Sequence, residues 1–394
     1  MGQQITSRMV LIGLLGSITV LPVLILPNLV GSVVDEFGFT ETQASTAASL
    51  NFIAGAIIAL VMAFRIRSLN LKKVAIASLL LAAVSDFLSG YTGNNIYFFM
   101  TVRALAGLGQ GAAYTAVMSS IARSQDPDRG YGMLMTMQFA ISALGLYLIP
   151  LVLPNAGIQG MFIGLTLMDL LGVFMATKLI SADRSIDKDV HDEGDLSRVE
   201  WKVIFSGAAI MVILGLCFLE TAMTAQFSFT ERVATQRLAM DPEVVGGVLA
   251  IASLLGVPGG FGCVLLGTRF GRSIPLFLGL VSSIIGVTML ALAQDAFTYS
   301  LSAYILGFTW AFTLPYYQAA QAALDPQGSV VAAGSFSGTI GNAAGPGLAG
   351  IAVLFGGYNA VLAMAGIMLL VSICCIPNFI LKRKEKRLLS EATG

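Results

Sequence analysis

The sequence predicts an all-α membrane protein with twelve transmembrane helices, arranged as two pseudo-symmetric bundles of six. Its composition is the first observation: 56% of the 394 residues are hydrophobic and only 11% are charged, whereas soluble domains carry about 25% charged residues. A soluble protein of this length could not cover its surface with so few charges. The equal numbers of basic and acidic residues, 22 of each, also argue against a nucleic-acid-binding protein.

Twelve apolar runs are the second observation, because a helix that crosses a bilayer needs about 20 mostly apolar residues. The first run carries Pro22 and Pro27 and is too long for a cleaved signal peptide. Only Pro154-Asn155-Ala156 separate the fifth run from the sixth. We place the helices at residues 9–33, 42–63, 73–90, 95–122, 131–153, 157–179, 203–227, 243–266, 273–293, 296–322, 330–354 and 359–381.

The distribution of basic residues is the third observation. If both termini are cytoplasmic, all but three of the 22 Lys and Arg residues fall in cytoplasmic segments. The exceptions are Arg103 inside the fourth run and Arg232 and Arg237 in an external loop. This asymmetry follows the positive-inside rule and supports the count of twelve. The short loops and small size favour a bacterial cytoplasmic (inner) membrane, with both termini in the cytoplasm.

An acidic polar stretch divides the chain into two similar halves. We interpret residues 181–202 as a cytoplasmic linker between an N-terminal bundle, 1–180, and a C-terminal bundle with a basic tail, 203–394. Gly107 in the fourth run has a counterpart in Gly307 of the tenth. A duplicated six-helix unit is typical of secondary transporters, whose halves rock around a site at the midplane of the membrane.

Three motifs carry a resemblance to a known family. Residues 267–272, Gly-Thr-Arg-Phe-Gly-Arg, resemble a shortened Gly-x-x-x-Asp-Arg-x-Gly-Arg-Arg loop, and residues 63–73 keep its basic members only. The fourth run contains Arg-x-x-x-Gly-x-Gly, and the eleventh contains a Gly-Pro motif similar to that of antiporters. With the twelve runs and the repeat, the chain resembles the major facilitator superfamily (MFS) over its whole length. The gating and motif residues that this resemblance implies are Arg65, Gly107, Gly111, Arg269, Gly271, Arg272, Gly345 and Pro346.

Four charged residues lie inside the predicted helices, where each costs about 2.5–3.5 kcal/mol on insertion scales. Glu220, in the seventh, is the main candidate for proton coupling, because a carboxyl in a low-dielectric cavity can change its protonation state near neutral pH. Arg103 and Asp169 are further proton-coupling candidates. Arg103 could instead hold an anionic substrate, or be satisfied by backbone carbonyls of the first helix. We expect Asp86, near the end of the third, to cap its helix or pair locally.

Polar and aromatic residues complete a predicted substrate cavity, which the resemblance places between the first, fourth, seventh and tenth helices. Aromatic rings with polar tips suit solutes that are part apolar and part polar. Any one of these residues could instead serve as an interhelical contact. The substrate-binding candidates are Asn28, Asn51, Arg103, Gln110, Tyr114, Gln138, Gln226, Trp310, Tyr316, Tyr317 and Asn342.

These residues predict a secondary transporter that moves a small organic solute across the cell membrane by alternating access. We expect proton coupling, and we favour an antiporter for efflux of amphipathic compounds. The alternative is a proton symporter or facilitator for uptake of a small organic anion, which the lone cation Arg103 would favour. We expect a monomer in contact with membrane lipid, with protons and a small molecule as ligands and with no nucleic acid.

Other classes of protein fit the sequence less well. An intramembrane enzyme would need paired His residues, metal ligands or a Ser/Lys dyad, but the single His, His191, lies in the linker. The four cysteines lie in apolar runs and do not form a zinc motif. The chain also lacks a phosphate-binding loop, so ATP-driven transport is not expected. A sensor built on a transporter scaffold would carry a large soluble domain. We therefore predict no enzymatic activity, metal or cofactor.

Overall fold

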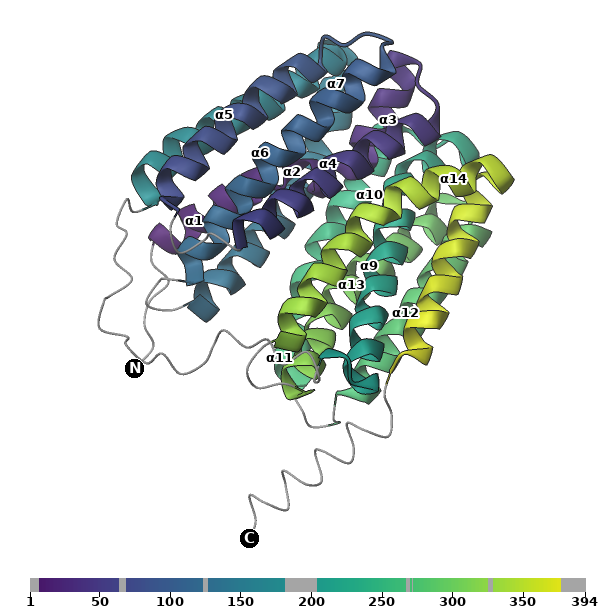
Figure 1. The fold of residues 1–394 in the computed structure, drawn as a ribbon. Helices are drawn as coiled ribbons and strands as arrows, with labels where there is room; N and C mark the ends of the chain where they lie inside the picture. The colour runs from purple at the N-terminus through teal and green to yellow at the C-terminus, as the bar shows by residue number, and fades with distance from the viewer. Residues whose placement is uncertain are drawn as a thin grey trace, which may run out of the picture. The chain divides into compact units, whose positions relative to one another are not determined.

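A computed structural model of the chain describes residues 7–63, 69–122, 127–180, 204–266, 270, 272–324 and 329–376. Every regular element among these residues is a helix (Figure 1). The chain forms two compact units. Unit 1 comprises Met1–Asp192 and Ser228–Ala250, and unit 2 comprises Glu193–Phe227 and Ile251–Gly394.

The first predicted span is built from three consecutive helices. The breaks lie at Val20 and Ile25, each two residues before a proline. Pro22 and Pro27 lie in the first turn of the next helix, where a missing N–H breaks no intrahelical hydrogen bond. The helices of the first half are α1 (Ser7–Thr19), α2 (Leu21–Leu24), α3 (Leu26–Phe37), α4 (Glu41–Ala63), α5 (Leu71–Ser89), α6 (Ile96–Ala122) and α7 (Pro127–Leu179).

The second half repeats this pattern of long helices. Its eighth predicted span is again broken, at Leu255, three residues before Pro258. Pro315 and Pro346 lie inside continuous helices instead. The elements are α9 (Gly207–Arg232), the π-helix η1 (Val233–Arg237), α10 (Pro242–Leu254), α11 (Gly256–Leu266), α12 (Ser273–Leu292), α13 (Ala296–Leu324) and α14 (Ser329–Cys374).

Two of these elements, α7 and α14, each contain two predicted spans. The turn in α7 lies at Gly157, with φ 61° and ψ −176°, so the predicted boundary at 154–156 is corrected by a residue. In α14 the turn lies at Gly356 and Gly357, and Gly357 has φ 62°. Glycine adopts a positive φ without the steric penalty of a Cβ atom. Pro154 stays inside the helix.

The described helices therefore accommodate the twelve predicted spans. Within the described residues, six helical stretches are long and apolar enough to cross a membrane, and two of them, Met133–Leu179 and Ala333–Cys374, contain one of these turns. The fold is that of an all-α membrane protein.

A close helix contact recurs in both halves. A Cβ atom on Gly107 of α6 would lie 1.9 Å from the Asn51 carbonyl oxygen of α4. On Gly307 of α13 it would lie 2.0 Å from the Ala252 carbonyl oxygen of α10. Glycine thus lets two helix backbones touch in each half. The shared geometry supports the internal repeat that the sequence predicts.

Candidate functional site

Three helices of unit 2 converge on the carboxyl group of Glu220. Glu220 lies on α9 and is 4% exposed. The indole Nε1 of Trp310, on α13, donates a hydrogen bond to Glu220 Oε2 at 3.3 Å. The side chain of Asn342, on α14, also hydrogen-bonds Glu220. Among the described residues, Glu220 is thus held by neutral donors and not by an ion pair.

Glycines of α14 bring Asn342 to this carboxyl group. A Cβ atom on Gly341 would lie 2.5 Å from the Cys217 carbonyl oxygen, and one on Gly345 would lie 2.0 Å from Thr224 Oγ1. Both contacts are with α9, so these glycines allow α14 to pack directly against it. The Gly-Pro motif of the eleventh span therefore has a packing role beside Glu220.

The Trp310 ring is fixed from a second side. Its centroid lies 5.8 Å from that of Phe227, with 68° between the ring planes, which is a favourable edge-to-face contact. Trp310 and Asn342 are both half-buried, so each keeps exposed surface next to the buried Glu220. These two side chains can contact a solute without a rearrangement of the helix packing.

A second group of polar side chains is buried inside unit 1. Arg103, on α6, forms an ion pair with Asp86 of α5, and the two residues are each 1% exposed. Gln110 Nε2 donates to the other Asp86 oxygen at 3.1 Å. Asn51 Nδ2, on α4, donates to Gln110 Oε1 at 3.1 Å and to the Arg103 carbonyl oxygen at 2.9 Å. The network links α4, α5 and α6.

Asp169 of α7 completes this network. It is 2% exposed, and its carboxyl group lies beside that of Asp86. Asp169 Oδ2 and Arg103 Nη2 have no hydrogen-bond partner. The Arg103 guanidinium lies 5.7 Å from the centre of the Phe162 ring, within the range of a cation–π interaction.

The position of Arg103 differs from two of its three sequence-based interpretations, the substrate-binding cation and the partner of backbone carbonyls. Its guanidinium pairs with a carboxylate on the third span, not with backbone carbonyls of the first. It is also buried in unit 1 and already neutralised by Asp86, so a lone cavity cation is not what the structure contains. Asp86 does pair locally, as expected, and its partner is Arg103 of α6.

Four other candidates are buried and contact neighbouring protein groups. Asn28 Nδ2 donates to the Leu146 carbonyl oxygen at 3.3 Å, and Gln226 Nε2 donates to that of Met223 at 3.1 Å. The Tyr317 hydroxyl donates to the Ser372 carbonyl oxygen at 3.0 Å, and the Tyr316 ring packs edge-on against Phe312. The four side chains are each at most 4% exposed. The contacts of Asn28 and Tyr317 join two helices, whereas those of Gln226 and Tyr316 lie within one helix, α9 and α13 respectively.

Two candidates of unit 1 keep exposed surface. Gln138 Nε2, on α7, donates to the Tyr114 hydroxyl, on α6, at 3.4 Å. Both side chains are half-buried. The pair can present an amide and a phenol to a solute, as Trp310 and Asn342 can in unit 2.

The sequence profile of the Major Facilitator Superfamily matches residues 9–344. The chain belongs to this superfamily. Two solved structures with the same fold are those of the nucleoside transporter NupG. Its D323A mutant has a TM-score of 0.76 and 11% identity, with 96% of this chain and 100% of that chain covered. The other NupG structure has a TM-score of 0.74 and 12% identity, with 97% and 100% covered.

No curated protein matches the sequence. At 11–12% identity, the likeness to NupG shows the fold alone. Membership of the superfamily makes the chain a secondary transporter and an integral membrane protein that acts on a small molecule. The observed helices and the superfamily match thus confirm the predicted MFS fold.

The superfamily loop motifs are only partly visible. Arg65, Arg269 and Gly271 lie outside the described residues. Arg272 is half-buried and directly precedes α12. In the fourth-span motif, a Cβ atom on Gly111 would lie 2.4 Å from the Gly55 Cα, so Gly111 serves close packing of α6 on α4 in the same way as Gly107.

One charged cluster of unit 1 is absent from the sequence-based predictions. Arg232 was placed in an external loop, but α9 continues to this residue, which is 6% exposed. Its guanidinium pairs with Asp35 at 2.6 Å and with Glu41 at 3.4 Å. Arg232 is therefore part of the helix and not of a loop, because these ion pairs stabilise the last turn of α9. The sequence signal for this cluster was the presence of opposite charges near the ends of the first, second and seventh predicted spans.

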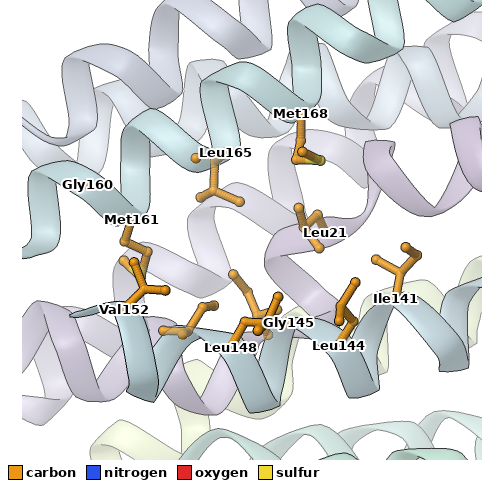
Figure 2. Close-up of a pocket in the computed structure, with 13 residues that line it drawn as sticks. Leu21, Ile141, Leu144, Gly145, Leu148, Val152, Gly160, Met161, Leu165 and Met168 are labelled. Atoms are coloured by element: carbon orange, nitrogen blue, oxygen red, sulfur yellow. The ribbon is translucent and has the colours of Figure 1, made fainter. Parts of the chain in front are cut away.

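Two largely apolar pockets are lined by none of the charged residues of these clusters. One, of about 280 Å³, is lined by α2 and both arms of α7, with Leu21, Leu148 and Met161 among its side chains (Figure 2). The other, of about 480 Å³, includes Tyr304 and Phe308 of α13. Neither is lined by a predicted substrate-binding residue. Both fit apolar contacts of the kind that lipid makes.

Proposed function

We propose that this MFS chain is a proton-coupled transporter that moves a small organic solute by alternating access. The observation that carries the proposal is the convergence of Trp310 and Asn342 on the buried Glu220. Within the described part of the chain, Glu220 has hydrogen-bond donors but no basic partner. It can therefore take up or release a proton without breaking an ion pair.

The half-buried polar side chains support an amphipathic substrate. Trp310 and Asn342 in unit 2, and Tyr114 and Gln138 in unit 1, combine ring surface with single hydrogen-bonding groups. None of these four side chains carries a charge. Such a lining favours a solute with both apolar and polar surface over a strongly charged one.

Efflux remains the favoured direction in this proposal. The alternative, uptake of a small organic anion, depended on Arg103 as a cation that a substrate could reach. Its ion pair with Asp86 and its 1% exposure remove that support. We place both termini in the cytoplasm, because the basic residues sort to one side. A bacterial inner membrane and a monomer remain part of the proposal.

Nucleosides belong among the test compounds, because the solved NupG structures share the fold. A thermal-unfolding screen of the purified chain against nucleosides, amphipathic cations and small organic anions identifies ligands, since a bound ligand stabilises the folded state. We expect an amphipathic compound to raise the melting temperature, and we expect Trp310→Ala to abolish that rise. Exposed Tyr97→Phe is the matched aromatic control.

Transport of the best ligand is then measured in proteoliposomes with and without a pH gradient. The proposal predicts accumulation that follows the proton gradient. Movement of the ligand that ignores the gradient would contradict proton coupling, and no movement at all would contradict transport of that ligand.

A further inference from the structure

The cluster inside unit 1 contains two carboxyl groups and only one cation. Asp86 and Asp169 are at most 2% exposed, and so is Arg103. These are the ionisable groups that act on the Asp169 carboxyl, and Asn51 and Gln110 add only neutral amides. With both carboxyls ionised, the buried cluster would carry a net negative charge. Such a charge is strongly unfavourable inside a membrane protein.

The two carboxyl groups differ in the hydrogen-bond donors that reach them. Asp86 accepts from Arg103 on one oxygen and from Gln110 on the other. A carboxylate that accepts several donors, one of them charged, is stabilised in its ionised form. Asp169 lacks such donors, and its Oδ2 has no partner.

The contact between the two carboxyls supplies the remaining argument. The Asp169 carboxyl lies beside the Asp86 carboxyl, and two adjacent buried carboxyl groups repel each other strongly unless one of them carries a proton. We propose that the Asp86–Asp169 pair is a proton-binding site that holds one proton at neutral pH, with the proton on Asp169 donated to Asp86 and with Arg103 as the fixed countercharge.

A proton fits this cluster better than a metal ion. A cation such as Ca²⁺ takes six to eight oxygen ligands, but both Asp86 oxygens are already occupied by donors from Arg103 and Gln110. Among the described residues, no three His, Cys, Asp or Glu side chains come together to hold a metal. The positive guanidinium further disfavours a second cation.

The site lies wholly in unit 1, whereas Glu220 lies in unit 2. It therefore adds a proton-binding position to the one proposed at Glu220, and it assigns a role to Asp86 that the sequence did not indicate. The proposal concerns where a proton is held and does not depend on the transport function.

Charge balance gives a separate expectation for each variant. The number of protonated carboxyl groups should equal the number of carboxyls minus the number of guanidinium groups. The expected number of protonated carboxyls is one in the wild type. It is zero in Asp86→Asn and in Asp169→Asn, because the remaining carboxylate then pairs with Arg103. It rises to two in Arg103→Gln.

Infrared spectroscopy of the purified full chain at neutral pH measures this directly, through the carbonyl stretch of a protonated carboxylic acid. Wild-type-minus-variant difference spectra cancel the signals of other carboxyls. We expect the same acid band to be lost in Asp86→Asn and in Asp169→Asn, and to gain intensity in Arg103→Gln. Asp295→Asn, which removes an exposed carboxylate outside the membrane, should leave the band unchanged.

An acid band that survives in Asp86→Asn or in Asp169→Asn would overturn the proposal, and so would a band that Arg103→Gln leaves unchanged. If Asp86→Asn or Arg103→Gln fails to fold, Asp169→Asn decides alone. Its amide can donate a hydrogen bond to Asp86, so the variant should melt as the wild type does and still lose the band. Retention of the band in this variant would refute the assignment and leave the proposed transport function intact.

Discussion

Trp310 donates its indole N–H to the carboxylate of Glu220, across an Nε1–Oε2 distance of 3.3 Å that joins α13 to α9. The donor and the acceptor are 90 residues apart in the sequence. The bond links the one half-buried tryptophan of α13 to a carboxyl group that has only neutral donors. A solute that contacts Trp310 can therefore influence the protonation of Glu220.

Replacement of Trp310 by Phe separates the hydrogen bond from the aromatic contact. Trp310→Phe keeps a ring against Phe227 but removes the donor to Glu220. We expect a folded protein that is less stable by about 1.5–3 kcal/mol, the usual contribution of a hydrogen bond to a charged group. We also expect slower proton-coupled transport. Thermal unfolding and proteoliposome uptake measure the two effects, and wild-type values in both would show that the bond is unimportant.

The glycine contacts predict paired effects in the two halves. Gly107→Ala and Gly307→Ala would place a Cβ atom within 2.0 Å of a backbone carbonyl oxygen of the neighbouring helix. We expect each to lower stability by about 1–3 kcal/mol, the usual effect of overpacking. Thermal unfolding in detergent measures the change.

Gly164→Ala and Gly366→Ala are the matched controls, because nothing lies within 4 Å of their added Cβ atoms. In these helices alanine is favoured over glycine by up to about 1 kcal/mol. We expect the controls to be unchanged or slightly more stable. Equal losses in all four variants would mean that the close contacts do not cause the destabilisation.

The ion pairs of Arg232 predict a ranking of two variants. Arg232→Gln removes both pairs of a guanidinium that is 7% exposed, whereas Asp35→Asn removes one pair whose acid is 56% exposed. Exposed pairs contribute about 0–1 kcal/mol, and breaking a buried one costs more. We expect Arg232→Gln to be the more destabilising of the two. The reverse order in thermal unfolding would mean that Glu41 contributes nothing.

Asp295 predicts a pH dependence outside the membrane-spanning helices. The backbone N–H of Thr298 donates to its carboxylate at 2.8 Å, and this bond lowers the pKa of Asp295. Because the folded-state pKa lies below the unfolded one, the contribution is complete above the ordinary carboxyl pKa and is lost as the pH falls through the lowered value. Asp295→Ala should therefore be less stable than the wild type at neutral pH, and the difference should vanish in acid. A constant difference across the titration would refute this account.

Much of the fold could be predicted from the apolar runs, because exposing polar groups to lipid is costly. The charge distribution supplied the topology, because basic residues concentrate in cytoplasmic loops. The turn at Gly157 was not predicted, because proline usually ends a helix and Pro154 was the more obvious boundary. In the structure Pro154 is helical, and Gly157 adopts the positive φ. The end of α9 was also misplaced, because Arg232 is stabilised there by acids far away in the sequence.

The candidate site was less accessible to sequence reasoning. Glu220 stood out because an intramembrane carboxyl is rare, and Trp310 because of its ring. The pairing of Arg103 with Asp86 depends on which faces of α5 and α6 meet, and Asn51 joins them only because Gly107 lets α4 and α6 touch. Such relations are set by tertiary packing, and no local pattern in the sequence encodes them.

Glu220→Gln tests the central claim most directly. The best ligand from the thermal screen is loaded into proteoliposomes, a pH jump is applied, and ligand and proton movements are recorded together. Exposed Glu243→Gln is the matched control. We predict that Glu220→Gln binds ligand but no longer moves protons with it or accumulates it against its gradient, while Glu243→Gln behaves as the wild type. Undiminished coupled accumulation in Glu220→Gln would contradict the assignment of Glu220 as the coupling residue.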